Sequence, residues 1–263
     1  MNSPANATTV QLIGGPTSLL RYGGLRILTD PTFDEPGDHP RPGSPIVLRK
    51  LTGPAIAADD LLPVDLVLLS HDHHADNLDD AGRAFLQSAT TVLTTTDGAA
   101  RLGGNAVGLE PGQVADLGLP GGAVQITAVE AHHGSPEMFE RNGPVLGFVL
   151  RGDDLPTIYV SGDNASVDVV REIASEHGPF DAAILFAGGA QVPERWGDDV
   201  LLTLDAAGAA EAAAILAPAT IIPIHQEGWA HCTSSPADLV GAFAAADVAE
   251  RLRSVAPGET VEL

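Results

Sequence analysis

The stretch that decides the fold runs from Val64 to Asp80 and reads VDLVLLSHDHHADNLDD. It starts with an apolar run of strand length, Val64 to Leu69, which predicts a core strand. The run then passes directly into the densest group of potential metal ligands in the chain. These ligands are His71, Asp72, His73, His74, Asp76, Asn77, Asp79 and Asp80. The change from core strand to polar cluster predicts a functional site at the C-terminal end of a strand.

Three imidazoles beside several carboxylates are difficult to explain by packing. Their clustering costs desolvation and repulsion unless a cation or water compensates. A divalent metal ion is the simplest compensator, because neutral imidazole and carboxylate are ordinary ligands of zinc, manganese and iron. The competing interpretation is a solvated acidic turn with incidental histidines. We favour the metal site.

Length and composition indicate a globular protein with a sizeable core. A chain of 263 residues buries roughly 70–75% of its extended surface. The residues are 44% apolar and 18% charged, which is ordinary for a soluble domain. Residues 1–9 lack the pattern of a signal peptide, and Cys232 is the only cysteine, so an intrachain disulfide is excluded. We expect a cytoplasmic protein.

The formal net charge of −22 restricts the partners of the chain. Its long-range field repels nucleic acid and anionic membranes. Lys50 is the only lysine, and Arg41, Arg49 and Lys50 are the nearest approach to a basic patch. We therefore expect a small-molecule substrate, with neither nucleic acid nor a membrane as partner. The sequence does not indicate the oligomeric state.

The chain opens with three short apolar or alternating runs, at residues 10–13, 18–22 and 25–29. Glycine pairs separate them, which predicts an antiparallel meander. The third run ends at Asp30, which is interpreted either as a turn former or as an acceptor that orients a ligand histidine. Residues 31–57 form a proline-rich loop in this interpretation, a flap beside the site, with His39 as a solvated residue.

Apolar runs and helix signals alternate after the central stretch, in an order typical of layered α/β folds. Strands are predicted at residues 91–95, 106–109, 124–129, 145–150, 157–160, 181–186, 220–224 and 261–263. Helices are predicted at residues 79–89, from 97, from 166, at 203–216 and at 236–248. The polar loop 191–199 is left without regular structure.

Four of the predicted strands end in residues of the metal-binding type. These endings are His71 to Asp76, His132 with His133, Asp163, and His225. Side chains at strand C-termini converge in layered α/β folds, so the four endings predict one shared site. Since the endings span more than 150 residues, we expect a single domain over residues 1–263.

The order of these motifs resembles the metallo-β-lactamase superfamily. The matching segments are SHDHHADNLD, AHHGS, YVSGDN and PIHQEGWAH. Through GGLRILTDP and the His-Asp-x-His character of the first motif, the chain looks most like the branch with L-ascorbate 6-phosphate lactonase and N-acyl phosphatidylethanolamine phospholipase D. The resemblance implies a four-layer αβ/βα sandwich with one or two divalent metal ions. Zinc is expected first, with manganese or iron as alternatives.

The resemblance also implies a ligand set. A first metal would be held by His71, His74 and His133, and a second by Asp76, Asp163 and His225. The first motif holds one residue more than the family pattern, so His73 competes with His74. We expect a one-residue bulge that selects His74. Asn77 stands where the family has a histidine, and its expected role is hydrogen bonding.

The activity implied by the resemblance is hydrolysis of a small lactone, ester or amide by a metal-bound hydroxide. Asp76 and His231 are the candidate catalytic residues, with His231 as a proton donor or as a structural partner. One alternative is an iron-dependent oxidoreductase of the same superfamily. Another is a degenerate protein that binds a small molecule without turnover, which Asn77 and the irregular motif suggest.

Overall fold

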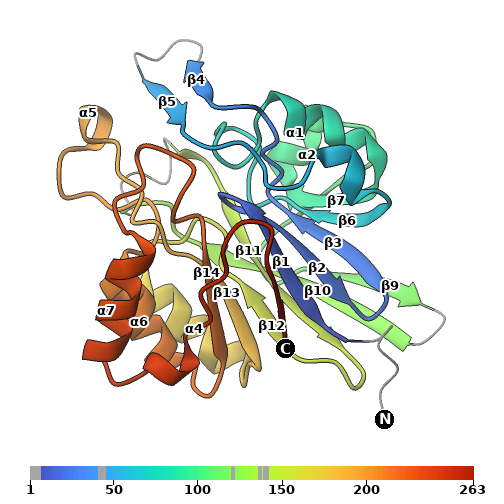
Figure 1. Cartoon of the computed structure of the whole chain (residues 1–263). Helices are drawn as coiled ribbons and strands as arrows, with labels where there is room; N and C mark the ends of the chain where they lie inside the picture. Colours follow the sequence, from blue (N-terminus) through green and yellow to red (C-terminus); the bar gives the residue numbers. More distant parts are fainter. Residues whose placement is uncertain (1–6, 41–45, 120–121, 136–137, 139–141) are drawn as a thin grey trace.

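Two β-sheets pack face to face in the computed structural model, which describes residues 7–40, 46–119, 122–135, 138 and 142–263 (Figure 1). The first sheet has the order β15 (Thr260–Glu262), β1 (Thr9–Gly14), β2 (Thr17–Tyr22), β3 (Leu25–Thr29), β6 (Val64–Leu68), β7 (Ala89–Thr95) and β8 (Ala106–Leu109). The first four strands pair antiparallel, which the glycine turns predicted for β1 to β3, and β3, β6, β7 and β8 pair parallel. The sheet is therefore mixed.

The second sheet is mixed as well. Its order is β14 (Thr220–Ile224), β13 (Ala182–Phe186), β12 (Ile158–Val160), β11 (Val145–Gly152), β10 (Gly122–Ala131) and β9 (Val114–Leu119). The strands β12, β13 and β14 are parallel, and β9 to β12 are antiparallel. Because the parallel strands of both sheets end at the same edge, the loops after them lie together.

Helices cover the outer face of each sheet (Figure 1). The helices beside the first sheet are α1 (Asp80–Phe85) and α2 (Thr96–Leu102), and those beside the second are α4 (Val167–His177), α6 (Ala206–Ile215) and α7 (Pro236–Ala245). Short 3₁₀ turns lie at Ala58–Leu61, Leu86–Ser88 and Ala249–Arg251, and α5 (Pro193–Trp196) is a single turn. The predicted α/β sandwich is confirmed.

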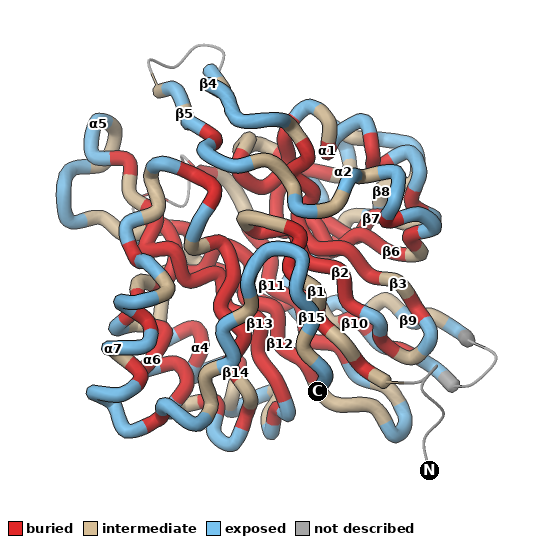
Figure 2. The backbone as a smooth tube through the Cα atoms, viewed as in Figure 1, coloured by how far each residue is buried: buried red, intermediate tan, exposed pale blue. Residues whose placement is uncertain are grey.

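The strands contribute alternate residues to opposite layers, as the two-residue period of a strand requires. In β6, Leu66 and Leu68 face the core between the sheets, whereas Val67 faces α1. In β13, Ile184 faces the same central core and Leu185 packs under α4, α6 and α7. Figure 2 shows these strands buried along most of their length. The near-continuous apolar runs of the sequence therefore reflect burial on both faces.

Most helices begin at a side-chain cap that was visible in the sequence. Asp79, Ser166 and Asp205 each accept a hydrogen bond from the backbone N–H three residues further on. Ser235 and Asp238 form a reciprocal capping box with Pro236 in the first helical turn. Since Asp205 is the cap, α6 begins at Ala206 and not at residue 203 as predicted.

The segment 31–57 was predicted as a loop, and this prediction is wrong in part. It contains β4 (Gly37–Pro40) and β5 (Val47–Lys50), which pair antiparallel. The hairpin was not predicted because its two strands have few apolar residues. Pro36 precedes β4 and Pro40 is the last residue of β4, which are positions where a strand tolerates proline. The strand β9 was missed for a related reason, since its sequence VADLGL is short and contains a glycine.

Lys50 fixes the base of the β4–β5 hairpin to the body of the protein. Its ammonium lies 2.8 Å from Asp79 Oδ2, and both side chains are almost fully buried. The same carboxylate caps α1, so one residue joins the hairpin and the helix. The backbone beyond β5 also bonds to the loop after β14, where Leu51 N–H donates to the Gly228 carbonyl at 2.7 Å. Among the residues described, no helix is both long and apolar enough to cross a membrane.

Candidate metal centre

The residues after β6, β10, β12 and β14 converge at one edge of the sandwich, as predicted. Two groups of three side chains result, His71 with His74 and His133, and Asp76 with Asp163 and His225. Within each group one potential ligand atom per residue lies within 4.8 Å of the others. These are the two sets that the sequence predicted as ligands. Whether they bind metal is a proposal that the geometry supports.

Backbone conformation turns two of these side chains toward the site. Gly162 has φ +57° and precedes Asp163, and a Cβ at this glycine would lie 2.3 Å from the Leu146 carbonyl oxygen. The close turn from β12 into Asp163 therefore requires glycine. His225 itself has φ +57°, which non-glycine residues adopt rarely. Such strain is typical of functional sites, and here it follows the end of β14.

Two imidazoles of the first group, His71 and His133, have a lowered pKa, which favours the neutral form. Burial and the neighbouring imidazoles hold the pKa of His71 well below its usual range. Burial also lowers the pKa of His133 to about 4, although the Asp76 carboxylate opposes that shift. Neutral imidazole offers the lone pair that a metal ion needs. His71 Nε2 and His74 Nδ1 lie 2.9 Å apart, close to the separation of about 3.3 Å expected for two nitrogens on one tetrahedral zinc ion.

Hydrogen bonds orient His71 before any ion arrives. Ser70 Oγ donates to Asp30 Oδ1 at 2.9 Å, and the Ser70 backbone N–H donates to the same oxygen at 2.7 Å. Because the hydroxyl proton points to Asp30, Ser70 Oγ accepts from His71 Nδ1–H, also at 2.9 Å. This leaves the lone pair of His71 on Nε2, facing His74. Of the two roles considered for Asp30, the structure places it as the acceptor that orients a histidine, through Ser70.

His133 is oriented in a similar way by the backbone. Its Nδ1–H donates to the Leu202 carbonyl at 2.8 Å, so the lone pair lies on Nε2. The Asn142 side-chain amide donates to the His133 carbonyl and holds the loop from the other side. The neighbouring His132 turns away, and its Nε2 lies 2.8 Å from Glu130 Oε1. The preference for His133 over His132 agrees with this arrangement.

The second group contains two carboxylates and one imidazole, all almost fully buried. His225 Nε2 lies 3.5 Å from Asp76 Oδ2 and 3.8 Å from Asp163 Oδ1. Asp163 Oδ2 lies 3.5 Å from His133 Nδ1, so this carboxylate stands between the two groups. Burial and the nearby Asp76 carboxylate raise the pKa of Asp163 well above its usual range. Two carboxylates in one buried place require a cation or a proton.

Unpaired polar atoms test whether a metal ion suits the second group. Asp76 Oδ1, Asp163 Oδ2 and both ring nitrogens of His225 are buried, and none has a hydrogen-bond partner among the described residues. Such atoms are rare in native interiors and usually mark an ion or a water molecule. Oxygen and imidazole donors in this number are ordinary ligands of zinc, manganese or iron. The residues present therefore fit a divalent cation.

Two more polar side chains support the second group. Asn77 Nδ2 donates to Asp163 Oδ1 at 3.2 Å, which is the hydrogen-bonding role expected for this residue. His231 Nε2 lies 2.9 Å from Asp76 Oδ2, and the His231 side chain is mostly buried. His231 thus holds the Asp76 carboxylate in place. Cys232 is also largely buried, with Sγ 3.5 Å from the His225 carbonyl.

The bulge predicted within the first motif is wrong, although His74 belongs to the first group and His73 does not. The strand β6 ends at Leu68, so no ladder remains at His71 in which a bulge could form. A turn begins at His74 instead, whose carbonyl accepts from the N–H groups of Asn77 and Leu78. Because of this turn, the side chain of His74 lies in the first group and that of Asp76 in the second. The Asp72 carboxylate anchors the loop through two hydrogen bonds from Arg101, at 2.9 and 2.5 Å.

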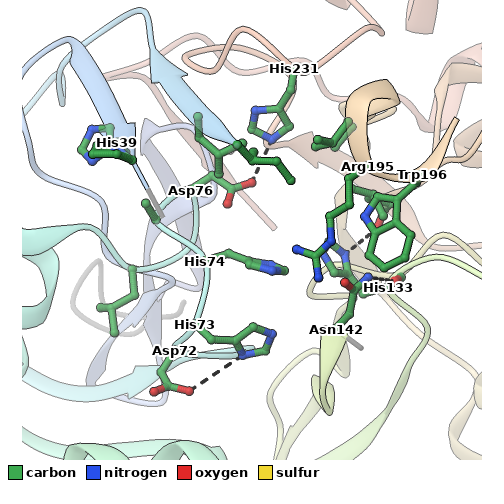
Figure 3. Close-up of a pocket in the computed structure, with 18 of the residues that line it drawn as sticks. His39, Asp72, His73, His74, Asp76, His133, Asn142, Arg195, Trp196 and His231 are labelled. Carbon is green, nitrogen blue, oxygen red and sulfur yellow. Dashed lines mark hydrogen bonds and ion pairs between the residues drawn. The ribbon is translucent and has the colours of Figure 1, made fainter. Parts of the chain in front are cut away.

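A pocket of about 200 Å³ opens beside both groups (Figure 3). His74, Asp76, His133 and His231 lie on its wall, together with His73. The β4–β5 hairpin supplies His39, Pro40 and Leu48. The α5 segment supplies Val192, Arg195 and Trp196. Described residues of the segment 31–57 thus line the pocket, and its role as a flap stays a prediction.

Several pocket residues were not predicted from the sequence. Arg195 and Asn142 lie in polar segments without a recognisable motif, so nothing in the sequence marked them as pocket residues. His39 was expected in solvent, but 14% of its side chain is exposed and its ring centre lies 5.2 Å from that of Trp229. The signal that could have identified His39 is the tryptophan in the loop after His225. Trp229 itself is core, with 1% exposure, and does not line this pocket.

Comparison with known proteins agrees with this geometry. Residues 25–226 match the family model described as the Beta-lactamase superfamily domain. A UPF0173 metal-dependent hydrolase of Pelotomaculum thermopropionicum is 30% identical over 95% of this chain and 97% of its own length. One from Pyrococcus furiosus is 28% identical over 92% and 93%. An isothiocyanate hydrolase from Delia radicum gut bacteria has a similar fold, with a TM-score of 0.81, 24% identity, and 97% and 98% of the two chains covered.

Proposed function

This chain belongs to the beta-lactamase superfamily and, within it, to the UPF0173 metal-dependent hydrolases, and we therefore propose that it hydrolyses a small lactone, ester or amide. The observation that carries the proposal is that members of both three-residue groups, His74 and His133 of the first and Asp76 of the second, line the wall of one pocket. A cavity of about 200 Å³ lies below the usual range for drug-sized ligands, so the substrate is small.

The residues divide into those that would hold metal and those that would handle the substrate. One ion would be held by His71, His74 and His133, and a second by Asp76, Asp163 and His225. Zinc suits the imidazole group, and the carboxylates of the second group suit manganese or iron as well. When bound, a divalent metal lowers the pKa of water and polarises the carbonyl oxygen that the water attacks.

His231 is the residue we assign to proton handling. Its Nε2 shares a proton with Asp76 Oδ2 across 2.9 Å, which fixes the ring against the pocket. The other ring nitrogen, Nδ1, has no hydrogen-bond partner among the described residues, so the protonated ring can give its Nδ1 proton to the leaving group as the scissile bond breaks and return to neutral imidazole. His231→Gln keeps a polar group of similar reach and removes the acid, so it should lower the rate by about a hundredfold or more, with metal content unchanged.

The proposal is tested by metal content and by turnover together. We expect one or two equivalents of zinc, manganese or iron per chain after gentle purification, measured by elemental analysis. The metal-loaded protein should hydrolyse members of a panel of small lactones, esters and amides, whereas the stripped protein should not. Less than a few tenths of an equivalent with every metal offered would overturn the proposal.

An iron-dependent oxidoreductase is the second candidate, favoured by the mixed carboxylate and imidazole donors of the second group. A visible absorption band of the aerobically purified protein, together with iron as the main metal, would favour it over hydrolysis. A binding protein without turnover is the third, and it rests on Asn77 in place of a histidine. Tight binding of a small molecule by the metal-loaded form, with no hydrolysis in the panel, would favour that candidate.

A further inference from the structure

We infer that the pocket holds the acyl chain of its substrate on an apolar wall and therefore prefers a short hydrocarbon chain to a polar one. The apolar wall consists of Leu48, Ala190, Val192 and Leu202, which line the pocket and belong to one hydrophobic cluster. This preference rests on the proposed hydrolysis and specifies its substrate class.

Two segments that are distant in the sequence build the apolar wall. Leu48 comes from β5 of the hairpin, and the other three residues flank α5 in the chain. Their cluster is separate from the core between the sheets and from the cores under the helices. A hydrophobic cluster that lines a cavity beside convergent polar groups is typical of a ligand-binding surface.

The backbone of the apolar wall has few hydrogen bonds to offer a substrate, because its own groups are paired. The Ala190 N–H donates to Thr203 Oγ1 at 3.0 Å, and the Ala190 carbonyl accepts from the Leu202 N–H at 2.8 Å. The Val192 carbonyl accepts from two N–H groups of α5, at 3.0 and 3.1 Å. A substrate hydroxyl placed on this wall would therefore lose its water without gaining a partner. A sugar-derived lactone fits poorly, whereas a hydrocarbon chain fits well.

The apolar wall is continuous with the candidate metal centre. The Leu202 side chain lines the pocket, while the Leu202 carbonyl accepts from His133 Nδ1–H at 2.8 Å. The rings of His74 and His133 face each other with their centres 5.1 Å apart, as Figure 3 shows. A substrate whose scissile carbonyl lies at these histidines would extend its acyl chain along the wall. The cavity of about 200 Å³ restricts that chain to a short one.

Charged side chains of the pocket are not required for this preference. Arg83 donates to the Asp72 carbonyl at 2.7 Å, and Arg195 Cζ lies 4.5 Å from the centre of the Trp196 ring. The formal net charge of −22 disfavours an anionic substrate at long range. A neutral ester with an alkyl acyl chain meets no such obstacle. We therefore assign the hydrocarbon chain as the occupant of the wall.

The test compares two methyl esters of the same length. Methyl 3-methoxypropanoate has an ether oxygen at the one position where methyl pentanoate has a methylene group. The methanol that leaves is too small to cover the wall, so only the acyl chain can do so. For the metal-loaded protein we expect kcat/KM, followed by proton release, to be at least about tenfold higher for the pentanoate. Equal values for the two esters would overturn the inference.

Leu48→Asn should remove most of this preference, because it places a polar amide on the wall. Val47→Asn is the matched control, since Val47 is the neighbouring residue on β5, is 51% exposed and lies outside the residues that line the pocket. It should leave the preference unchanged. Val192→Thr adds one hydroxyl to the wall with the same shape, and it should lower the preference severalfold.

Metal content should be the same in all three variants and in the parent protein. An equal loss on both esters in Leu48→Asn would show a structural role and overturn the inference, as would an equal loss of preference in Val47→Asn. If Leu48→Asn does not fold, Val192→Thr decides, and an unchanged preference in that variant would overturn the inference.

If the parent protein hydrolyses neither ester, the proposed function fails for esters, and binding then decides the inference. Saturation-transfer NMR of the metal-loaded protein should show at least about tenfold tighter binding of methyl pentanoate than of methyl 3-methoxypropanoate. The difference should shrink in Leu48→Asn and persist in Val47→Asn. Equal binding of the two esters by the parent protein would overturn the inference.

Discussion

The two candidate ligand groups differ in how far hydrogen bonds from the rest of the protein satisfy their side chains. In the first group, His71 is oriented by Ser70 and His133 by the Leu202 carbonyl. In the second, atoms of Asp76, Asp163 and His225 are buried without a hydrogen-bond partner among the described residues. The first group is preorganised for a cation, whereas the second depends on a cation to compensate for burial.

The two groups also differ in how much their burial costs the stability of the metal-free protein. Buried imidazoles remain neutral at little cost, because neutrality suits a low dielectric. Two buried carboxylates cannot both remain charged without a counterion. Removal of metal should therefore affect the second group more than the first. Among substitutions in and around the two groups, we expect the largest effect on metal binding at Asp163 and the smallest at Asn77.

Asp163→Asn should have the largest effect. It removes a carboxylate that lies between the groups, so about one equivalent of metal should be lost. Hydrolysis should fall about a thousandfold, which corresponds to about 4 kcal/mol of transition-state stabilisation. In the metal-free form, however, the melting temperature should not fall, because a buried carboxylate has been replaced by a neutral amide. Full metal occupancy, or strong destabilisation of the metal-free variant, would contradict the proposed dependence of the second group on a cation.

His74→Ala should weaken the first group alone. Zinc affinity at that group should fall by more than about a hundredfold, the upper end of losses seen when an outer hydrogen-bond partner is removed. His73→Ala is the matched control, because His73 lies beside the first group but outside it. It should change the affinity by less than a few-fold. A larger loss in His73→Ala would reverse the assignment of the two histidines, and zinc titration with a competing chelator measures both.

Ser70→Ala tests whether the first group is preorganised. The substitution breaks the link between Asp30 and His71, and zinc affinity should fall about 10- to 100-fold. Ser18→Ala serves as the control, since Ser18 is equally buried and its hydroxyl bonds to Thr29 Oγ1, away from the candidate ligands. Imidazole NMR of the metal-free variant should show a mixed tautomer at His71. If both variants lose the same affinity, the effect is general destabilisation.

Asn77→Ala should have the smallest effect. A single neutral hydrogen bond to Asp163 contributes about 1 kcal/mol, so metal affinity at the second group should fall roughly fivefold. Affinity at the first group should not change and provides an internal reference. A loss of the second ion altogether would show that Asn77 is itself a ligand.

Much of this arrangement could be predicted because it depends on local rules. Short sequence patterns mark strand ends, glycine turns and helix caps. These patterns predicted β6, β12 and β14 and the polar residues that follow each strand. The order of the motifs along the chain then predicted that His71, Asp163 and His225 share one site. The metal-binding role of these residues stays a prediction.

The parts that were missed depend on contacts between distant segments. The β4–β5 hairpin is held by a buried ion pair with Asp79 and by backbone bonds to the loop after β14, and neither leaves a periodic pattern in residues 37–50. The position of Arg195 in the pocket depends on the short α5 turn in a segment predicted as loop. The bulge prediction failed because the end of β6 is set by its neighbours in the sheet, not by its own sequence.

The burial of Lys50 allows local opening of the β4–β5 hairpin to be measured by chemical labelling. Lys50 is the only lysine in the chain, and 4% of it is exposed. Reagents that acylate side-chain amines therefore reach it only when the β4–β5 hairpin separates from α1. The rate of acylation, followed by mass spectrometry, reports the free energy of this local opening. Because the same hairpin forms part of the pocket wall, a ligand that fills the pocket should slow the labelling of a residue it never touches.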